Sequence, residues 1–75
     1  MKSVRRLPRD DVTVRILLLA KTGVPKETIQ EAVALPSHQF QREMAALVDR
    51  GLLHLDVKRN VWITTSKGHA FLQDT

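Results

Sequence analysis

The hydrophobic residues of this 75-residue chain change their spacing near Gly51, and this change restricts the folds that the chain can adopt. Before Gly51, apolar residues recur at intervals of three and four, as they do along one face of an α-helix. After it they alternate with polar residues, at Leu53, Leu55, Val57, Val61 and Ile63. Alternation with a period of two is typical of a half-buried β-strand. The sequence therefore predicts a mainly α-helical domain that carries one small β-hairpin.

The first helix that this spacing predicts is apolar on two sides. Asp10 or Asp11 can cap it, and Gly23 can end it in the left-handed conformation that glycine adopts at little cost. One apolar stripe comprises Val12, Ile16, Leu19 and Ala20, and the other comprises Val14, Leu17 and Leu18. Such a helix needs two surfaces to pack against. We favour a central helix with both sides internal, and the alternative is that Val14, Leu17 and Leu18 form the seam of a homodimer.

Two further helices are predicted between Pro25 and Gly51. Pro25 suits the first turn of a second helix, because its fixed φ is already helical and its missing N–H would have no partner there. Ser37 is a favourable N-cap for a third helix over residues 38–50. Gly51 then ends the third helix, and Leu52 is placed for the hydrophobic contact that often accompanies a glycine cap.

The alternating segment favours a hairpin with a three-residue loop. The loop residues are Lys58, Arg59 and Asn60. With Asn60 left-handed, Val57 pairs with Val61, and the apolar residues of both strands stay on one face. A two-residue loop would divide the apolar residues between the two faces. The three-residue loop is therefore the register that agrees with the apolar pattern.

This register places Trp62, the only tryptophan of the chain, on the outer face of the hairpin opposite Asp56. There the indole either packs on His54 and Thr64 or lies at a surface that contacts a partner, because a large aromatic side chain is rarely left exposed. We favour the structural role.

A last short helix is predicted after the hairpin. Thr65 or Ser66 can cap it, and Phe71 and Leu72 give it an apolar side that packs back onto the body. The predicted order is therefore three helices, a two-stranded hairpin and a short C-terminal helix. This order is the layout of a winged helix-turn-helix.

The chain also resembles a known family over roughly residues 27–72. Its "ETIQEAVAL" is similar to the second helix of the winged helix-turn-helix transcriptional regulators, which include the multiple-antibiotic-resistance and PadR-type repressors. Its "LVDRGLL" is similar to the end of their recognition helix, and its "ITTSKGHAFL" to the segment where their wing returns. The resemblance implies binding to double-stranded DNA, with the third helix in the major groove and a basic wing on the backbone or in the minor groove. The chain departs from the family pattern at Ala34, where the family often has a turn glycine.

The side chains that would read DNA follow from the faces of the third helix. On a helical wheel, the residues that face the core are Phe40, Met44, Leu47 and Val48. The predicted base-reading residues are His38, Gln39, Arg42 and Ala45, with Gln41 ranked below them because it lies beside Val48. Arginine can form two hydrogen bonds with guanine and glutamine two with adenine, and an alanine methyl can contact a thymine methyl. The alternative is a polar helix face that is only solvated.

Basic residues outside the third helix are candidates for contacts with the DNA backbone or the minor groove. The formal net charge is +4, but four of the twelve basic residues precede the first acidic one, and the remaining eight are balanced by eight acidic residues. Residues 1–9 therefore form a basic arm on an electrically neutral domain of residues 10–75. The predicted contacts are Arg5, Arg6 and Arg9 in the arm, Lys58 and Arg59 in the hairpin, and Ser37 and Lys67 at helix starts. Alternatively, the arm and the hairpin tip are only solvated.

Enzymatic and metal chemistry find no support in the sequence. The chain has no cysteine, its three histidines lie in different predicted elements, and its three glycines are isolated rather than gathered in a phosphate-binding loop. We therefore expect no enzyme, no metal site, no cofactor and no small-molecule effector. The longest apolar run, residues 16–20, is too short to cross a membrane, and we expect a cytoplasmic, nucleoid-associated protein.

The leading hypothesis is a small, dimeric, repressor-like transcriptional regulator that binds specific double-stranded DNA sequences. A single recognition helix reads only a few base pairs, so we expect two copies on a two-fold related site. One alternative is an architectural DNA-binding protein, such as a partition or recombination-accessory protein of a plasmid or phage. Another alternative is a winged helix that contacts only other proteins, for which the neutral domain is the main argument.

Overall fold

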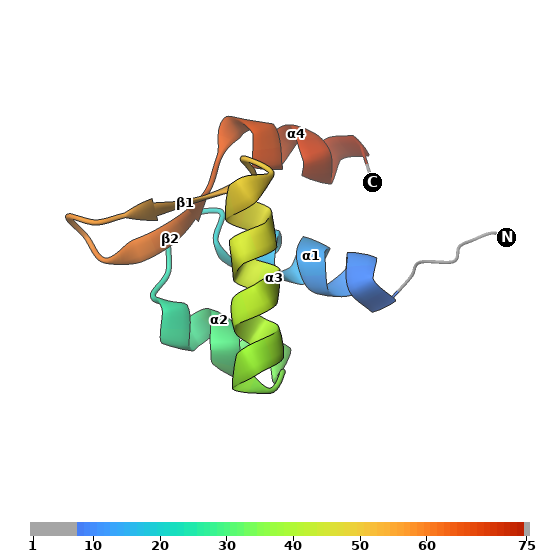
Figure 1. Ribbon diagram of the computed structural model, residues 1–75. Coiled ribbons are helices and arrows are strands. Elements are labelled where there is room, and N and C mark those ends of the chain that lie inside the picture. Colours follow the sequence, from blue (N-terminus) through green and yellow to red (C-terminus); the bar gives the residue numbers. More distant parts are fainter. Residues whose placement is uncertain (1–7, 75) are drawn as a thin grey trace, which may run out of the picture.

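The computed structural model describes residues 8–74, and for residues 8–11 and 74 it describes the backbone alone (Figure 1). Its elements are α1 (Pro8–Leu19), α2 (Lys26–Val33), α3 (Ser37–Asp49), β1 (Leu53–Asp56), β2 (Val61–Thr64) and α4 (Ser66–Asp74). The described residues thus form four helices and one two-stranded antiparallel hairpin. The predicted fold class is confirmed in this coarse form, and the layout is compatible with a winged-helix-like arrangement.

The hydrophobic core lies where α1 passes behind α3 (Figure 1). The largest fully buried side chains are Ile16 and Leu17 of α1, Ile29 of α2, and Phe40 and Leu47 of α3. α1 also packs against α2, α4 and β2. Leu17 of the second apolar stripe is buried as completely as Ile16 of the first, but Leu18 of the same stripe is 50% exposed, so the second side of α1 is internal only in part.

α1 begins before the two aspartates that the sequence predicts as its cap. It starts at Pro8 and ends at Leu19, and Gly23 follows the turn at residues 20–22 with a positive φ of 91°. Proline is favoured in the first turn of a helix, because its missing N–H would have had no partner there. Pro8 and Arg9, which the sequence assigns to the arm, consequently belong to the helix backbone.

Each of the next two helices begins directly after a proline. The prediction that Ser37 caps α3 is wrong, because α3 begins at Ser37 itself, Pro36 occupies the N-cap, and no side chain caps the first turn. Pro25 likewise precedes α2 instead of lying in its first turn. Both prolines have the extended backbone that an N-cap requires, with ψ of 146° and 155°. The Ser37 hydroxyl instead accepts a long hydrogen bond of 3.4 Å from Nε2 of Gln30.

The turn before α3 contains Ala34 in the left-handed conformation, with φ 52° and ψ 40°. Its N–H donates to the carbonyl of Gln30 at 3.0 Å, which closes the last turn of α2. A left-handed alanine costs roughly 1–2 kcal/mol, because its Cβ approaches the following carbonyl oxygen. This turn therefore has the backbone that glycine favours, but it carries alanine and is strained.

The turn after α3 is capped by glycine, as predicted. Gly51 has a φ of 78°, and its N–H donates to the carbonyl of Val48 at 3.0 Å. The N–H of Leu52 donates to the carbonyl of Leu47 at 3.0 Å, and both leucine side chains are buried. These two hydrogen bonds form a Schellman motif with its hydrophobic contact. The hydroxyl of Thr65 donates to the carbonyl of Gly51 at 2.6 Å and ties the turn to the segment before α4.

The hairpin register differs by one residue from the predicted one. Leu55 pairs with Trp62, and the turn contains four residues instead of three. The last of them, Asn60, has a φ of 57° and is left-handed, as predicted. The prediction placed Thr64 on the outer face because it is polar, but Thr64 is buried and its hydroxyl donates to the carbonyl of Leu17 at 2.6 Å. A hydroxyl that forms such a bond is tolerated in the core.

The observed register turns Trp62 toward α3. Directly paired residues of an antiparallel ladder share a face, so Trp62 lies with Leu55 and not, as predicted, opposite Asp56 on the outer face with His54. Its backbone also bonds to Val24, through N···O distances of 2.8 and 3.0 Å. The indole is half-buried and packs against the core.

α4 is capped by Thr65 and folds back on the core, as predicted. The N–H of Gly68 donates to Oγ1 of Thr65 at 3.0 Å, and Phe71 and Leu72 pack against the core. Gly68 is buried, and a Cβ at this position would collide with the carbonyl oxygen of Leu52. α4 therefore covers the turn that ends α3.

Candidate nucleic-acid interface

α3 exposes the polar face that the sequence predicts. Its buried side consists of Phe40, Met44 and Leu47, and the packing of these three side chains fixes the rotation of the helix about its axis. The predicted reading residues His38, Gln39, Gln41, Arg42 and Ala45 are all exposed. The first turns of α3 therefore present hydrogen-bonding side chains to a possible partner, on a helix whose opposite face is held in the core.

Arg42 has the greatest capacity for recognition on this face. Within the described part of the chain, its guanidinium forms no ion pair and no hydrogen bond. It can therefore offer two parallel N–H donors to one acceptor pair. Ala45 and Ala46, about one turn further along, are exposed and small, so no bulky side chain blocks an approach to this part of the helix. Asp49 is also exposed, and its charge would repel a phosphate at the far end.

The prediction that Val48 faces the core is wrong. Val48 is 43% exposed, although Met44 and Leu47 beside it are buried. The wheel places Val48 at the edge of the apolar side, and the elements that pack on α3 leave this edge partly uncovered. Val48 therefore lies at the rim of an open space next to α3.

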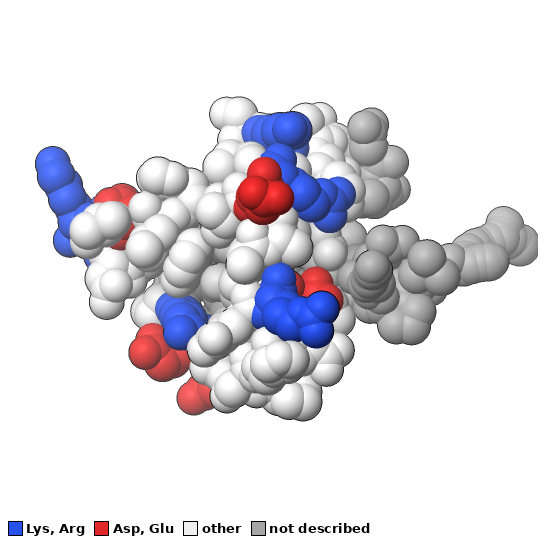
Figure 2. All heavy atoms as spheres, viewed as in Figure 1, with Lys and Arg blue, Asp and Glu red and all other residues white. Residues whose placement is uncertain are grey.

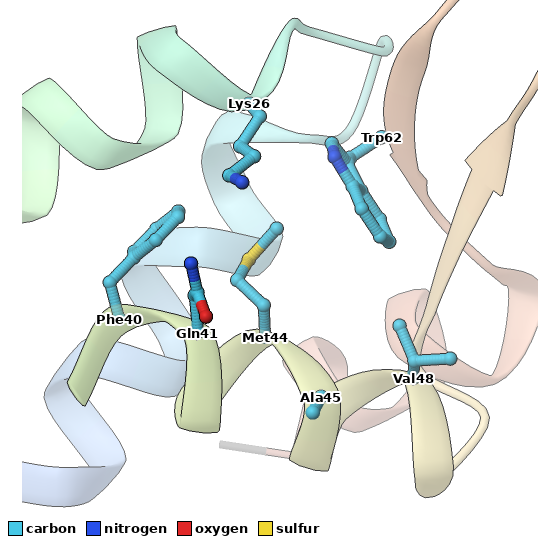
Figure 3. A pocket seen from close by; sticks show the side chains of 7 residues that line it. All are labelled: Lys26, Phe40, Gln41, Met44, Ala45, Val48 and Trp62. Carbon is cyan, nitrogen blue, oxygen red and sulfur yellow. The ribbon is translucent and has the colours of Figure 1, made fainter. Parts of the chain in front are cut away.

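This open space is a groove of about 220 Å³ between α3, β2 and the first turn of α2, and we call it the α3–β2 groove (Figure 3). It is lined by Lys26, Phe40, Gln41, Met44, Ala45, Val48 and Trp62. Two of the predicted reading residues, Gln41 and Ala45, thus face the groove as well as solvent. The polar face of α3 and the groove are continuous at these two residues.

Sequence reasoning missed Lys26 and the contribution of Trp62 to this surface. Lys26 is the first residue of α2, and its proximity to α3 depends on how the two helices pack. The presence of the single tryptophan of the chain within an alternating segment was the available signal. A hairpin register shifted by one residue placed that signal on the wrong face.

The tip of the hairpin exposes Lys58 and Arg59, and this exposure agrees equally with contacts to a phosphate backbone and with a turn that is only solvated. The N–H of Arg59 donates to Oδ1 of Asp56 at 3.4 Å, a long bond within the turn. Val57 beside them is 78% exposed. The hairpin projects from the body to one side of α3 (Figure 1), so the two cations and the polar face of α3 form separate parts of the surface.

Ser37 and Lys67, the other two predicted backbone contacts in the described residues, lie at opposite ends of α3. Ser37 begins α3, whereas the side chain of Lys67 lies beside Gly51, which follows its C-terminus. A helix of 13 residues is about 20 Å long, so one phosphate cannot contact both. A cation next to the C-terminus of a helix interacts favourably with the helix dipole, which gives Lys67 a structural explanation.

The charges on this side of the molecule are mixed. Figure 2 shows basic side chains at the hairpin tip and over α3, with acidic side chains among them. The predicted arm residues Arg5 and Arg6 lie outside the described residues, and the side chain of Arg9 does too. The described surface in this view therefore has no continuous basic patch.

The residues of the alternative dimer seam do not form a continuous surface. Leu17 is fully buried within the chain, Val14 is half-buried, and Leu18 alone of the three is exposed, at 50%. The burial of Leu17 contradicts its place in a seam, because the core already covers it. Leu18 lies instead at a shallow depression that Leu19 and Ala32 also line.

None of the helices in the described residues is both long and apolar enough to cross a membrane. Comparison of the chain with protein-family models, curated proteins and solved structures finds no match. The assignment of a function therefore depends on the geometry described above.

Proposed function

We propose that the chain is a winged helix-turn-helix domain that binds double-stranded DNA, with α3 in the major groove. The observation that carries the proposal is the exposed set of His38, Gln39 and Arg42 at the start of a helix whose opposite face is buried. Helices that enter the major groove usually contact base edges with residues near their N-terminus. The exposed cations Lys58 and Arg59 in the following hairpin supply contacts to the phosphate backbone or the minor groove.

The chemistry of the three side chains suits base recognition. Arg42 can form two hydrogen bonds with O6 and N7 of guanine, and Gln39 can form two with N6 and N7 of adenine. Each good pair of this kind discriminates against the wrong base by about 1–3 kcal/mol. The small side chains of Ala45 and Ala46 allow the helix to approach the groove wall closely.

In this proposal the protein acts in the cytoplasm as a repressor-like regulator and binds as a homodimer. One α3 reads only a few base pairs, and two copies on a two-fold site supply the missing specificity. The exposed Leu18, with Leu19 and Ala32 beside it, is a candidate for part of the contact between the copies.

A protein-interaction module is the second candidate function, and the mixed charges in Figure 2 favour it. DNA-binding surfaces are usually much more positive than surfaces that contact proteins. Salt dependence separates the two candidates, because neutralising Z phosphates lowers log K linearly with log salt at a slope of about −0.9Z.

The experiment measures the affinity of the full chain for duplex DNA at increasing salt. We expect binding at low salt that weakens with a slope corresponding to several phosphates, and a flatter slope when Arg5 and Arg6 are replaced by alanine. The double variant Lys58→Ala, Arg59→Ala removes two of the proposed hairpin contacts and should flatten the slope as well. The absence of measurable affinity at low salt would reject DNA binding and leave the protein-interaction module.

A further inference from the structure

We propose that a depression between the C-terminal end of α3 and α4 binds a phosphate monoester that carries a small apolar group. We call it the α3–α4 depression, and it is lined by Arg50, Leu52, Lys67, Ala70 and Phe71. Its volume is about 490 Å³, and typical sites for small molecules measure roughly 300–1,000 Å³. The depression shares no lining residue with the α3–β2 groove and lies at the opposite end of α3 from the proposed reading residues.

Two cations line the depression. Arg50 follows the last residue of α3, Lys67 lies in the first turn of α4, and both side chains are exposed. Within the described residues, neither side chain forms an ion pair or a side-chain hydrogen bond. An anion between them would meet two positive charges. A phosphate monoester, which carries about −1.5 to −2 charges at pH 7, therefore matches the pair better than a singly charged anion.

The side chain of Arg50 is positioned by Phe71. Its guanidinium carbon lies over the Phe71 ring, 5.4 Å from the ring centroid, within the range of a cation–π contact. The N–H groups at the edge of the guanidinium stay free, and they can donate two parallel hydrogen bonds to phosphate oxygens. Lys67 adds a compact charge with three donors. The depression therefore presents one oriented pair of donors and one point charge to the same anion.

The other lining residues are apolar. Leu52 is buried, Phe71 is half-buried, and Ala70 is exposed but small. An apolar group attached to the phosphate would remove part of this surface from water, which is favourable in proportion to the area covered. Inorganic phosphate would leave it uncovered. The apolar and cationic residues line one depression, so the expected ligand carries an apolar group and a phosphate together.

Two features at this end of α3 oppose an anion, and both are moderated by the structure. The C-terminus of a helix carries a partial negative charge, but the carbonyls of residues 46–48 already accept hydrogen bonds from backbone N–H groups of the following turn. Asp49 is exposed, and Figure 2 shows acidic atoms beside the basic ones where α3 ends. Asp49 does not line the depression, however, whereas both cations do. Binding of the ester does not depend on DNA, so it is independent of the proposed function.

The test is a titration of the full chain with phenyl phosphate, without DNA, followed by proton–nitrogen NMR. The titration is made at about pH 7.5, well above the second pKa of a phosphate monoester, which is about 6. The amides of Gly51, Leu52 and Ala70 report the depression. We expect saturable shifts centred on these three residues. Shifts that do not saturate, or that centre on other cations such as Lys58 and Arg59, would overturn the proposal.

The preference for a second negative charge is tested with phenyl sulfate, which has nearly the same shape but only one charge. An exposed ion pair typically changes affinity by about two- to fivefold, so phenyl phosphate should bind more tightly by this factor at about pH 7.5. The advantage should disappear at about pH 5, where the phosphate has taken up a proton. The sulfate keeps its charge and controls for changes in the protein. Equal affinities at the higher pH would overturn the assignment to a monoester, because a DNA phosphate would then serve as well.

The contribution of Lys67 is tested by substitution. Lys67→Met should lower the affinity for phenyl phosphate to about that of phenyl sulfate, because one of the two positive charges is lost. The matched variant Lys21→Met removes an exposed lysine that does not line the depression, and it should leave the affinity unchanged. An affinity of Lys67→Met equal to that of the unmodified chain would overturn the place of Lys67 in the site.

The apolar part and the source of the ester are tested with three further compounds. Inorganic phosphate should bind more weakly than phenyl phosphate, and equal affinities would overturn the contact with the apolar residues. A free metabolite and a phosphorylated side chain of a partner protein both supply such an ester. Adenosine 5′-monophosphate and N-acetyl-phosphotyrosine amide represent these two sources, and the tighter ligand identifies the source. Failure of both to bind at the depression would overturn the proposal.

Discussion

The two turns that flank α3 use the same left-handed backbone with different residues. Before α3 the left-handed residue is Ala34, with a φ of 52°, and after α3 it is Gly51, with a φ of 78°. Glycine adopts a positive φ without a steric penalty, whereas alanine loses roughly 1–2 kcal/mol. The turn before α3 is therefore strained, and the turn after it is relaxed.

The two turns also differ in the contacts that hold them. The turn after α3 is tied to Thr65 by a 2.6 Å hydrogen bond and covered by Gly68 of α4. The only side-chain hydrogen bond across the turn before α3, within the described residues, is the 3.4 Å contact between Gln30 and Ser37. The C-terminal end of α3 is thus fixed by the rest of the fold. The first turns, which carry the proposed DNA-reading residues, are held by the buried side chain of Phe40 and by this one long hydrogen bond.

The largest expected effect comes from a substitution in α4 that disrupts its packing on the turn after α3. Gly68→Ala should lower the free energy of unfolding by about 3 kcal/mol, because the new Cβ would collide with the backbone at Leu52 and with the side chain of Thr64. Urea denaturation measures the effect. As a control, Ala70→Gly on the exposed side of α4 should cost only about 1 kcal/mol through helix propensity. A loss for Gly68→Ala no greater than that of the control would show that α4 does not pack on this turn as described.

A smaller loss is expected when the left-handed residue after α3 is changed to match the turn before it. Gly51→Ala should cost about 1–2 kcal/mol through backbone strain alone, because a Cβ there would meet only the side chain of Lys67, at 3.6 Å from Cδ. Gly51→Asn should cost less, since asparagine tolerates the left-handed conformation better than alanine. Denaturation curves in which both variants lose equal stability would contradict an origin in backbone conformation.

Replacing the left-handed alanine in the turn before α3 by glycine should stabilise the protein. We expect this change in stability to be smaller than the two described above. Ala34→Gly relieves the strain but gives the unfolded chain more freedom, so we expect a gain of about 0.5–1 kcal/mol. Thermal and urea unfolding would measure it. Ala46→Gly, at an exposed position within α3, should instead lose about 1 kcal/mol. A loss of stability for Ala34→Gly would mean that Ala34 is not strained.

The parts of the fold that depend on local signals could be predicted from the sequence. The helical spacing of Phe40, Met44 and Leu47 identified the buried side of α3, and Gly51 identified its end. Both signals involve only residues that are close in the sequence. The first is the helical spacing of apolar side chains, and the second is the left-handed backbone conformation that glycine favours. The exposure of the proposed reading residues follows from the same two signals, since a helix with one side buried must expose the other.

The hairpin register and the groove could not be predicted, because they depend on contacts between distant residues. The hydroxyl of Thr64 is buried because it bonds to the carbonyl of Leu17, 47 positions earlier. Trp62 is held in its register by backbone hydrogen bonds to Val24, which lies before α2. The alternation of apolar and polar residues along the strands indicates neither of these contacts. Because the predicted register was wrong by one residue, Trp62 was assigned to the wrong face of the hairpin, and the groove that it lines was not predicted.

The central claim, that the exposed face of α3 reads DNA, is tested most directly by selecting bound sequences from random duplex DNA with the unmodified chain, Arg42→Ala and Lys21→Ala. Each variant removes one positive charge from an exposed side chain, and Lys21 lies in the turn after α1, outside the proposed interface. We predict a two-fold symmetric motif that Lys21→Ala retains. Arg42→Ala should lose the preference at particular base pairs, worth about 1–3 kcal/mol each. Recovery of the same motif by all three proteins, or of none by the unmodified chain, would contradict the claim.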